Sequence, residues 1–228
     1  MAKGPRRLLA KAIMFDIDGT LFDSRDAFYF MIKDVFAQKG WALPEKNDIL
    51  RLIGRTNEYI GDALVPPGPK HPEAVRRWST TVVKLWIDEY LPKHVRMYPK
   101  ALEALTELDR RGFKLAIVTN GSSREIPLYL KQGGVTKFVD LVVTADDVSH
   151  PKPDPDILDF ARAKLGVEKK DCVYVGDTWM DAKAAERAGL RCVLVTWGID
   201  SREELEAQTH AALVSSFDEL LDLFTFAR

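Results

Sequence analysis

The sequence lacks any hydrophobic run approaching the roughly 20 apolar residues that a membrane-spanning helix needs. It also lacks an excess of either charge: 33 Lys and Arg face 34 Asp and Glu, for a formal net charge of −1. Such a balance gives no general attraction to nucleic acid or to anionic lipid, so neither is expected as a partner. At the start of the chain, MAKGPRRLLAKAIMF, the apolar part is short and broken by Lys11, which favours a flexible basic start over a signal peptide.

Cysteine and histidine are scarce as well. The two cysteines, Cys172 and Cys192, match no zinc-binding spacing and lie within apolar runs, as buried thiols do. The four histidines show no ligand spacing either. These features indicate free thiols in a reducing compartment, and the cytoplasm is the expected location.

What the chain does have is an alternation of short apolar runs and amphipathic helical patterns. The apolar runs predict buried strands at residues 11–15, 113–119, 139–143, 172–177 and 191–198. Helical patterns occur at 100–112, 122–134, 154–166 and 181–189. Apolar strands that alternate with helices predict a doubly wound, Rossmann-like α/β fold, in which a parallel sheet is covered on both faces.

A block without a strand pattern interrupts this alternation between residues 20 and 97. Helical spacing of apolar residues recurs at 23–39, in two shorter stretches up to 64, and at 73–90. A loop rich in proline and glycine, 65–72, precedes the last of these. We therefore expect an all-helical cap domain, residues 21–95, inserted into a Rossmann-like core made of residues 1–20 and 96–228.

Polar side chains follow three of the expected strands, at the point where each strand ends. In parallel α/β sheets the carboxyl ends of the strands meet at one edge, where ligands bind. Residues far apart in the sequence are therefore expected to converge there. The polar residues at or just after these strand ends are Asp16, Asp18, Thr119, Asn120, Asp177 and Asp181.

The chemistry of this set is that of phosphoryl transfer. Asp16, Asp18 and Asp177 make a hard, oxygen-rich site of the kind that Mg²⁺ prefers. Lys152, which lies between two prolines, is placed to pair with phosphate charge and with the aspartates. Together they indicate Mg²⁺-assisted phosphoryl transfer with a carboxylate nucleophile.

An anion site is expected beside these acids. Thr119, Asn120 and Gly121 offer a hydroxyl, an amide and backbone N–H groups just before a predicted helix, whose N-terminus favours negative charge. Ser122 or Ser123 is the expected N-cap of that helix. Pro127 is unfavourable in this helix unless it lies in the first turn.

The stretches DIDGTL, a strand ending in TN, KPDPD and GDTWMD occur in this order at successive strand ends. In this combination the sequence resembles the haloacid dehalogenase superfamily, and within it the phosphoglycolate-phosphatase-like phosphatases with an inserted helical cap. The resemblance runs from about residue 11 to residue 214. One departure is Lys100, where the family usually has glycine after the YP pair.

The resemblance implies a role for each motif residue. Asp16 is implied as the nucleophile that becomes an aspartyl phosphate, and Asp18 as the general acid and then the general base. Thr119 and Lys152 are implied to hold the phosphoryl group. The implied Mg²⁺ ligands are Asp16, the backbone carbonyl of Asp18, and Asp177, with Asp181 in support.

Substrate recognition is expected from the cap. In ILRLIGRTNEYIG, residues 49–61, Gly54 breaks a helical pattern, and the resemblance places such a turn at the cap tip that faces the active site. Arg55 and Thr56 follow it, so they join Asn120 and Gly121 as expected substrate-binding residues. An arginine there suits a second anionic group, which predicts a small phosphorylated metabolite of the phosphoglycolate kind.

Other functions stay open on the sequence alone. Family members that do not protonate an alcohol leaving group lack the second acid, so Asp18 favours a phosphate ester over carbon–halogen or carbon–phosphorus bonds. A sugar-phosphate mutase uses the same pair of acids. A non-catalytic binding module has no need of the complete set of motif residues. The sequence is compatible with a monomer or a homodimer.

Overall fold

The computed structural model describes residues 7–227, so most of the expected basic start, residues 1–6, lies outside the described part. Its centre is a six-stranded sheet in the order β6-β5-β2-β7-β8-β9, in which neighbouring strands run parallel. The strands are β2 (Ala12–Phe15), β5 (Lys114–Val118), β6 (Leu141–Val143), β7 (Cys172–Gly176), β8 (Arg191–Val195) and β9 (Ala212–Val214). The predicted parallel α/β fold is confirmed.

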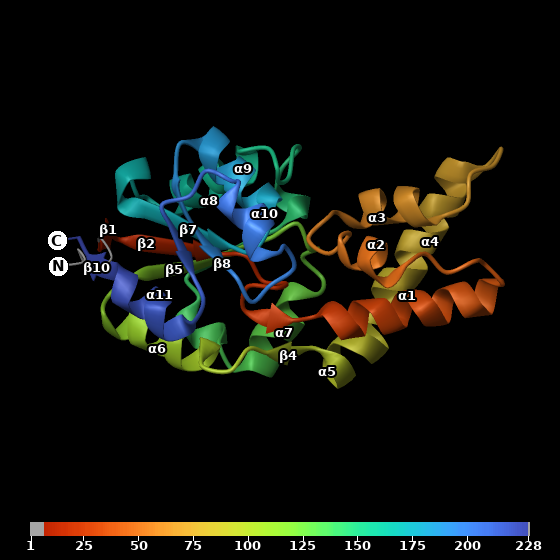
Figure 1. Cartoon of the computed structure of the whole chain (residues 1–228), viewed down its shortest axis with the longest axis horizontal. Coiled ribbons are helices and arrows are strands. Elements are labelled where there is room, and N and C mark those ends of the chain that lie inside the picture. The colour runs from red at the N-terminus through yellow and green to blue at the C-terminus, as the bar shows by residue number, and fades with distance from the viewer. Residues whose placement is uncertain (1–6, 228) are drawn as a thin grey trace.

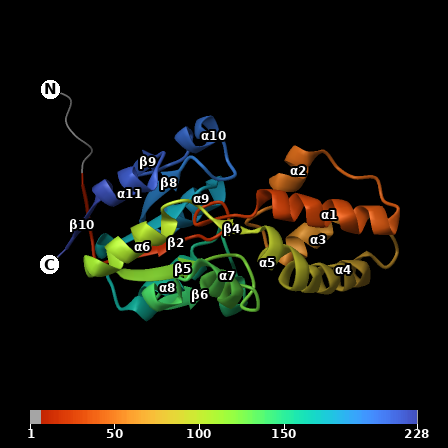
Figure 2. The same cartoon turned by 90° about the horizontal axis from the view of Figure 1, so that it is seen from below.

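Helices cover both faces of this sheet (Figures 1 and 2). Side chains alternate along β2: Ile13 and Phe15 belong to the core on one face, and Ala12 and Met14 to the core on the other. The helices on the first face are α6 (Ala101–Arg110), α7 (Ile126–Gly133) and α11 (Phe217–Leu223), and those on the second are α8 (Asp156–Leu165), α9 (Trp179–Ala188) and α10 (Arg202–Glu206). Burial of each large apolar side chain between these layers contributes about 1.5–3 kcal/mol.

A second, two-stranded sheet joins the ends of the described chain. β1 (Leu8–Ala10) pairs in parallel with β10 (Phe224–Phe226). The expectation of a flexible start is therefore wrong for Leu8–Ala10. The physical reason is that Ala10 is fully buried and its carbonyl accepts a hydrogen bond from Ala227 N, so this segment is anchored to the far end of the chain.

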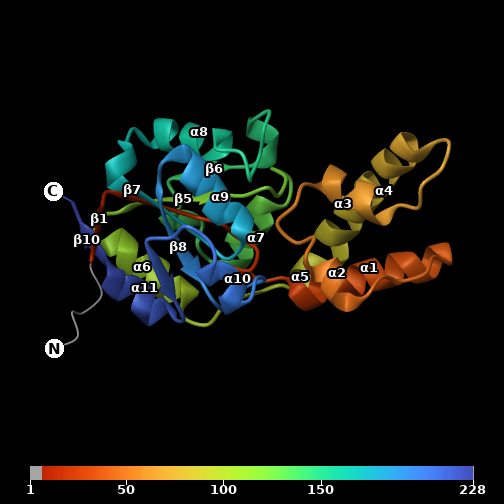
Figure 3. The same ribbon diagram turned by 45° about the horizontal axis from the view of Figure 1, so that its top comes forward.

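The helical block extends from one end of the sheet (Figures 1 and 3). It comprises α1 (Arg25–Lys39), α2 (Lys46–Leu50), α3 (Asn57–Leu64), α4 (His71–Leu85), a π-helical turn (Trp86–Tyr90) and α5 (Leu91–His94). α3 and α4 pack closely at Gly61, where an added Cβ would lie 2.9 Å from Val75 Cγ1. Across residues 7–227, no helix combines the length and the apolar content needed to cross a membrane.

One strand pair lies where no strand was expected. β3 (Phe22–Asp23) and β4 (Arg96–Met97) run antiparallel, so the chain enters and leaves the helical block side by side. Two-residue strands carry no readable periodicity, which is why the sequence pattern missed them. Together β3 and β4 form a short ribbon between the sheet and the helices.

Candidate active site

The loop after β2 turns sharply because of one glycine. Gly19 has φ of +80°, a conformation that favours glycine, and its N–H donates to the Phe22 carbonyl. A Cβ at Gly19 would lie 2.1 Å from an Asp177 carboxylate oxygen. The turn therefore brings the end of β2 against the end of β7, and any larger residue would displace Asp177.

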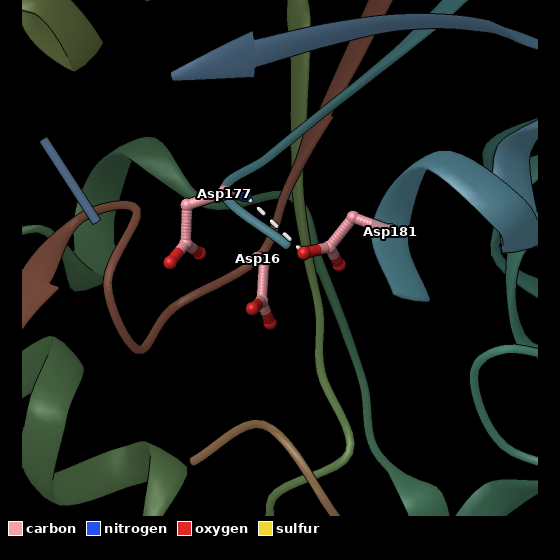
Figure 4. Close-up of side chains that lie close together, drawn as sticks. All are labelled: Asp16, Asp177 and Asp181. Atoms are coloured by element: carbon pink, nitrogen blue, oxygen red, sulfur yellow. Dashed lines mark hydrogen bonds between the residues drawn. The ribbon is translucent and has the colours of Figure 1, made fainter. Parts of the chain in front are cut away.

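Three carboxylates converge at this edge of the sheet, as Figure 4 shows. Asp16, Asp177 and Asp181 each place a carboxylate oxygen within 4.8 Å of the others, and all three are buried. Asp177 accepts hydrogen bonds of 2.8 Å from the Thr20 hydroxyl and from the Ile199 N–H. The predicted convergence of acids from distant parts of the sequence is therefore present in the fold.

Asp181 is more constrained than the other two acids. Its Oδ2 caps helix α9, accepting from the Thr178 N–H at 3.0 Å and from the Thr178 hydroxyl at 2.7 Å. Its Oδ1 accepts from Lys152 Nζ at 2.7 Å and from the Tyr174 hydroxyl at 2.9 Å. Because each oxygen of Asp181 accepts two or more hydrogen bonds, whereas each oxygen of Asp177 accepts one, Asp181 is suited to holding Lys152 in place rather than to binding a ligand directly.

Lys152 lies among these acids with only 4% of its surface exposed. Its ammonium group lies 3.0 Å from Asp16 Oδ1 and 2.7 Å from Asp181 Oδ1, and it donates to the Tyr174 hydroxyl at 2.8 Å. These contacts occupy all three N–H donors. A phosphoryl oxygen that binds Lys152 must therefore replace one of these partners.

The carboxylates of this cluster outnumber its cations. Three carboxylates face a single ammonium group, which leaves two negative charges if every group is ionised. Burial raises the pKa of Asp16 to about 7, although the charge of Lys152 acts to lower it. Burial, together with the charges of Asp181 and Asp16, raises the pKa of Asp177 well above its usual value. Although burial acts to lower the pKa of Lys152, the neighbouring carboxylates hold it above its usual value. A divalent cation bound here would supply the missing charge, and the all-oxygen donor set fits Mg²⁺.

Asp18 has different surroundings from Asp16, although one residue separates them. Its Oδ1 accepts a 2.7 Å hydrogen bond from the Tyr129 hydroxyl of α7. Burial raises the pKa of Asp18, and the bond from Tyr129 opposes that rise. Two acids in unlike environments are the usual basis for separate nucleophile and acid roles.

The segment after β5 is built differently from what the sequence indicated. The Asn120 side chain donates to Gly54 O at 3.0 Å and to Lys152 O at 2.9 Å, and accepts from Lys152 N at 2.9 Å. It therefore joins three loops instead of offering a free amide. Thr119 Oγ1 accepts from Gly121 N at 3.1 Å, which leaves the Thr119 hydroxyl proton available to a ligand.

The helix after this segment also begins later than expected. α7 starts at Ile126 with Glu125 at the N-cap position, so the prediction of Ser122 or Ser123 as N-cap is wrong. The Ser122 N–H instead donates to the Glu125 carboxylate at 2.6 Å. Pro127 lies in the first turn of α7, where proline is tolerated. Since the helix starts five residues after Gly121, the Thr119–Gly121 segment does not form its first turn.

Two residues of this region escaped the sequence interpretation. Glu125 and Tyr129 both line the cavity beside Asp18, and burial raises the pKa of Glu125 to about 8. Their spacing of four residues places them on one face of α7, which is the signal that was available. Helical spacing alone does not distinguish a residue of a cavity wall from a residue of the core.

A cavity of about 50 Å³ lies between the helical block and the sheet. Its apolar wall comprises Phe28, Met31, Ile53, Ile60, Val82 and Trp86, and Asp18 lies at its border. Arg55 is the cation among its lining residues. The Arg55 guanidinium lies 4.7 Å from the Tyr59 ring centre and 5.0 Å from that of Trp179, and its Nε is buried without a hydrogen-bond partner.

Two other residues near Gly54 have contacts of their own. The Thr56 side chain caps α3 by accepting from Tyr59 N at 3.3 Å, and Thr56 is not among the residues that line the cavity. Arg51 forms an ion pair of 3.3 Å with Glu204, on an exposed surface. Of the cap residues expected to bind substrate, the structure therefore brings Arg55 to the cavity.

A family model described as haloacid dehalogenase-like hydrolase matches residues 13–195. The chain is 30% identical to the pyrophosphatase PpaX of Bacillus velezensis, over 93% of this chain and 95% of that protein. It is 29% identical to a phosphoglycolate phosphatase of Rhodobacter capsulatus, over the same shares of the two chains. A haloacid dehalogenase-like family hydrolase from Streptococcus pneumoniae shares the fold, with a TM-score of 0.79 at 23% identity, covering 93% of this chain and 97% of that one.

Proposed function

The chain belongs to the haloacid dehalogenase-like hydrolases, and we propose that it is a Mg²⁺-dependent phosphatase that cleaves small phosphate monoesters through an aspartyl phosphate on Asp16. The observation that carries the proposal is the buried cluster of Asp16, Asp177 and Asp181 around Lys152, with Asp18 held apart from it. We take residues 1–20 and 96–228 as the catalytic core and residues 21–95 as the cap.

The proposed reaction has two steps. Asp16 attacks phosphorus, so that a carboxylate–phosphorus bond forms while the bond from phosphorus to the leaving oxygen breaks. Asp18 gives its proton to the leaving oxygen. Asp18 then takes a proton from a water molecule, whose oxygen attacks the aspartyl phosphate and releases phosphate and Asp16.

The remaining residues hold the groups that react. The Thr119 hydroxyl donates to a phosphoryl oxygen, and Lys152 orients Asp16 and offsets its charge. Asp16, Asp177 and the backbone carbonyl of Asp18 are the proposed Mg²⁺ ligands, with Asp181 supporting them through Lys152 and α9. When bound, the ion offsets the charge of the carboxylates and of the phosphoryl group.

Metal removal tests this assignment. EDTA should abolish activity and lower Tm, and Mg²⁺ should restore both, because the ion relieves the repulsion among buried carboxylates. Ca²⁺ should not support turnover, since its higher coordination number favours bidentate carboxylates and so occupies the attacking oxygen of Asp16. Asp177→Asn, which keeps the volume, should raise the Mg²⁺ concentration needed for half-maximal activity and stabilisation by at least ~10-fold.

The matched control for that variant is Asp156→Asn. Asp156 pairs with His150 on the surface, so this variant should respond to Mg²⁺ as the unmodified protein does. Undiminished activity in EDTA, or an unchanged Mg²⁺ requirement in Asp177→Asn, would contradict the metal assignment.

The cavity supports a small leaving group that carries one negative charge. A volume of about 50 Å³ accommodates roughly four water-sized groups. Arg55 is the cation that lines it, and its unpartnered Nε is available to a carboxylate. We therefore propose a substrate of the phosphoglycolate kind, as the name of the Rhodobacter capsulatus relative also suggests.

Arg55→Ala should lower kcat/KM for phosphoglycolate by at least ~10-fold, because a charged hydrogen bond contributes ~1.5–3 kcal/mol. The loss with p-nitrophenyl phosphate should be clearly smaller, since that ester has no carboxylate. Steady-state phosphate release measures both. Arg51→Ala is the matched control, because Arg51 lies in the same segment but pairs with Glu204. Equal losses of kcat/KM on both esters would show that Arg55 does not recognise the carboxylate of the substrate.

A substrate panel separates this proposal from its alternatives. Pyrophosphate belongs in it because one relative is named a pyrophosphatase, but its leaving phosphate carries more charge than a single Arg55 offsets. A hexose phosphate distinguishes hydrolysis, which releases inorganic phosphate, from a mutase reaction, which moves the phosphate. A non-catalytic module would release phosphate from none of these compounds.

A further inference from the structure

Tyr129 contacts a reacting group, yet the steps described above do not use it. Its hydroxyl donates a 2.7 Å hydrogen bond to Asp18 Oδ1, and the residue is 1% exposed. Tyr129 belongs to α7, which is distant in sequence from the loop that carries Asp18. The bond therefore ties the expected general acid to a separate rigid element.

The Tyr129 ring is itself held in a fixed place. Phe22 packs edge-on against it, with ring centres 5.1 Å apart and planes at 85°. Phe22 is in turn confined by Gly133, where an added Cβ would lie 2.7 Å from the Phe22 ring. Phe22 belongs to β3, directly after the Asp18 loop. The hydroxyl is thus positioned by the same short segment that positions Asp18.

We propose that Tyr129 is a positioning residue for the general acid: by donating to Asp18 Oδ1, it leaves Oδ2 to carry the transferable proton and turns that oxygen toward the leaving group. This inference rests on the proposed phosphatase function. A carboxyl group has two equivalent oxygens and a broad, two-fold side-chain torsion, so a single fixed donor is sufficient to distinguish them. Asp18 and Tyr129 both line the cavity in which the proposed function places the leaving group.

The effect of losing the hydroxyl should depend on the leaving group. An alkoxide leaves poorly and needs the proton, whereas p-nitrophenolate leaves readily without it. Tyr129→Phe keeps the ring and its contact with Phe22. It should lower kcat for an alkyl phosphate by ~10-fold or more and change kcat for p-nitrophenyl phosphate by less than ~3-fold.

Tyr90→Phe is the matched control. Tyr90 also donates its hydroxyl to an aspartate, Asp34, but in the helical block away from Asp18. The same chemical change there should alter neither rate. If Tyr129→Phe lowered kcat equally for the alkyl ester and for p-nitrophenyl phosphate, the proposal would be overturned. Equal losses would indicate a general structural effect.

A double-mutant cycle with Asp18→Asn separates this inference from the proposed function. If Tyr129 acts through Asp18, adding Tyr129→Phe to Asp18→Asn should change kcat for the alkyl ester by less than ~2-fold. Independent, multiplicative losses would overturn the positioning role. If Asp18→Asn by itself affected both esters equally, the acid role of Asp18 would fail, which is a different result from a failure of Tyr129.

Thermal melting shows whether each variant folds. Should Tyr129→Phe unfold, Phe22→Leu provides a second test, because it loosens the Tyr129 ring and keeps the hydroxyl. It should reproduce the same preference for loss on the alkyl ester, at smaller magnitude. Equal effects of Phe22→Leu on the two esters would count against the proposal.

Discussion

Asp16→Asn is expected to remove nearly all turnover while the protein remains folded. The amide has almost the same volume as the carboxylate but cannot form the acyl phosphate bond, so the covalent route is lost entirely. We expect kcat to fall by at least ~10³-fold, which corresponds to about 4 kcal/mol of barrier. Steady-state phosphate release with p-nitrophenyl phosphate gives a sensitive measurement, because its leaving group makes the smallest demand on Asp18.

Detection of the covalent intermediate is an independent test of the same prediction. Acid quenching during turnover, followed by mass spectrometry, should show a phosphorylated peptide that contains Asp16 in the unmodified enzyme and none in Asp16→Asn. Asp156→Asn serves as the surface control. Retention of more than a tenth of the original kcat in Asp16→Asn, or a phosphorylated residue elsewhere, would refute the nucleophile assignment.

Lys152→Met is expected to have the largest combined effect on stability and activity. Methionine matches the length of the lysine stem but leaves Asp16 and Asp181 without their shared cation. Breaking a buried ion pair from one side costs about 3–5 kcal/mol, so the free energy of unfolding in EDTA should fall by about that amount. Activity should fall by at least ~100-fold, because Asp16 loses the contact that orients it and favours its ionised form.

Chemical unfolding in EDTA measures the stability change, and phosphate release in Mg²⁺ measures the activity. Lys183→Met is the matched control, since Lys183 pairs with Glu186 on the surface, where ion pairs contribute at most about 1 kcal/mol. An unfolding free energy in Lys152→Met as high as in Lys183→Met would show that the cluster does not need its lysine.

The sequence predicted the parts of the fold whose signal is local. Strands such as Cys172–Gly176 are continuous apolar runs, and a residue pair such as Asp16 and Asp18 follows such a run directly. The shared site followed from one topological rule, that parallel strands end at the same edge. The later elements α10, β9, α11 and β10 carry weaker patterns and were not anticipated.

What escaped prediction depends on contacts between distant residues. The Asn120 amide was expected to face a ligand, but its hydrogen bonds to Gly54 and Lys152 depend on where two other loops lie. The partnership of Tyr129 with Asp18 likewise has no local signature. Lys100 is a different case. From the sequence, Lys100 stood out only as a departure from the glycine usual in the family. Its φ of +68° is a conformation that favours glycine, which explains that usual choice.

The β3–β4 ribbon bears on how a chain of this kind diversifies. Because Asp23 pairs with Arg96, the helical block leaves and rejoins the core at neighbouring points. Genetic recombination with both breakpoints in this ribbon would exchange the whole block in one event, and the acids, Lys152 and Thr119 would all stay with the parent chain. On the proposed function, such an exchange would replace Arg55 and most of the apolar cavity wall in one step, while the proposed reacting groups would be passed on unchanged.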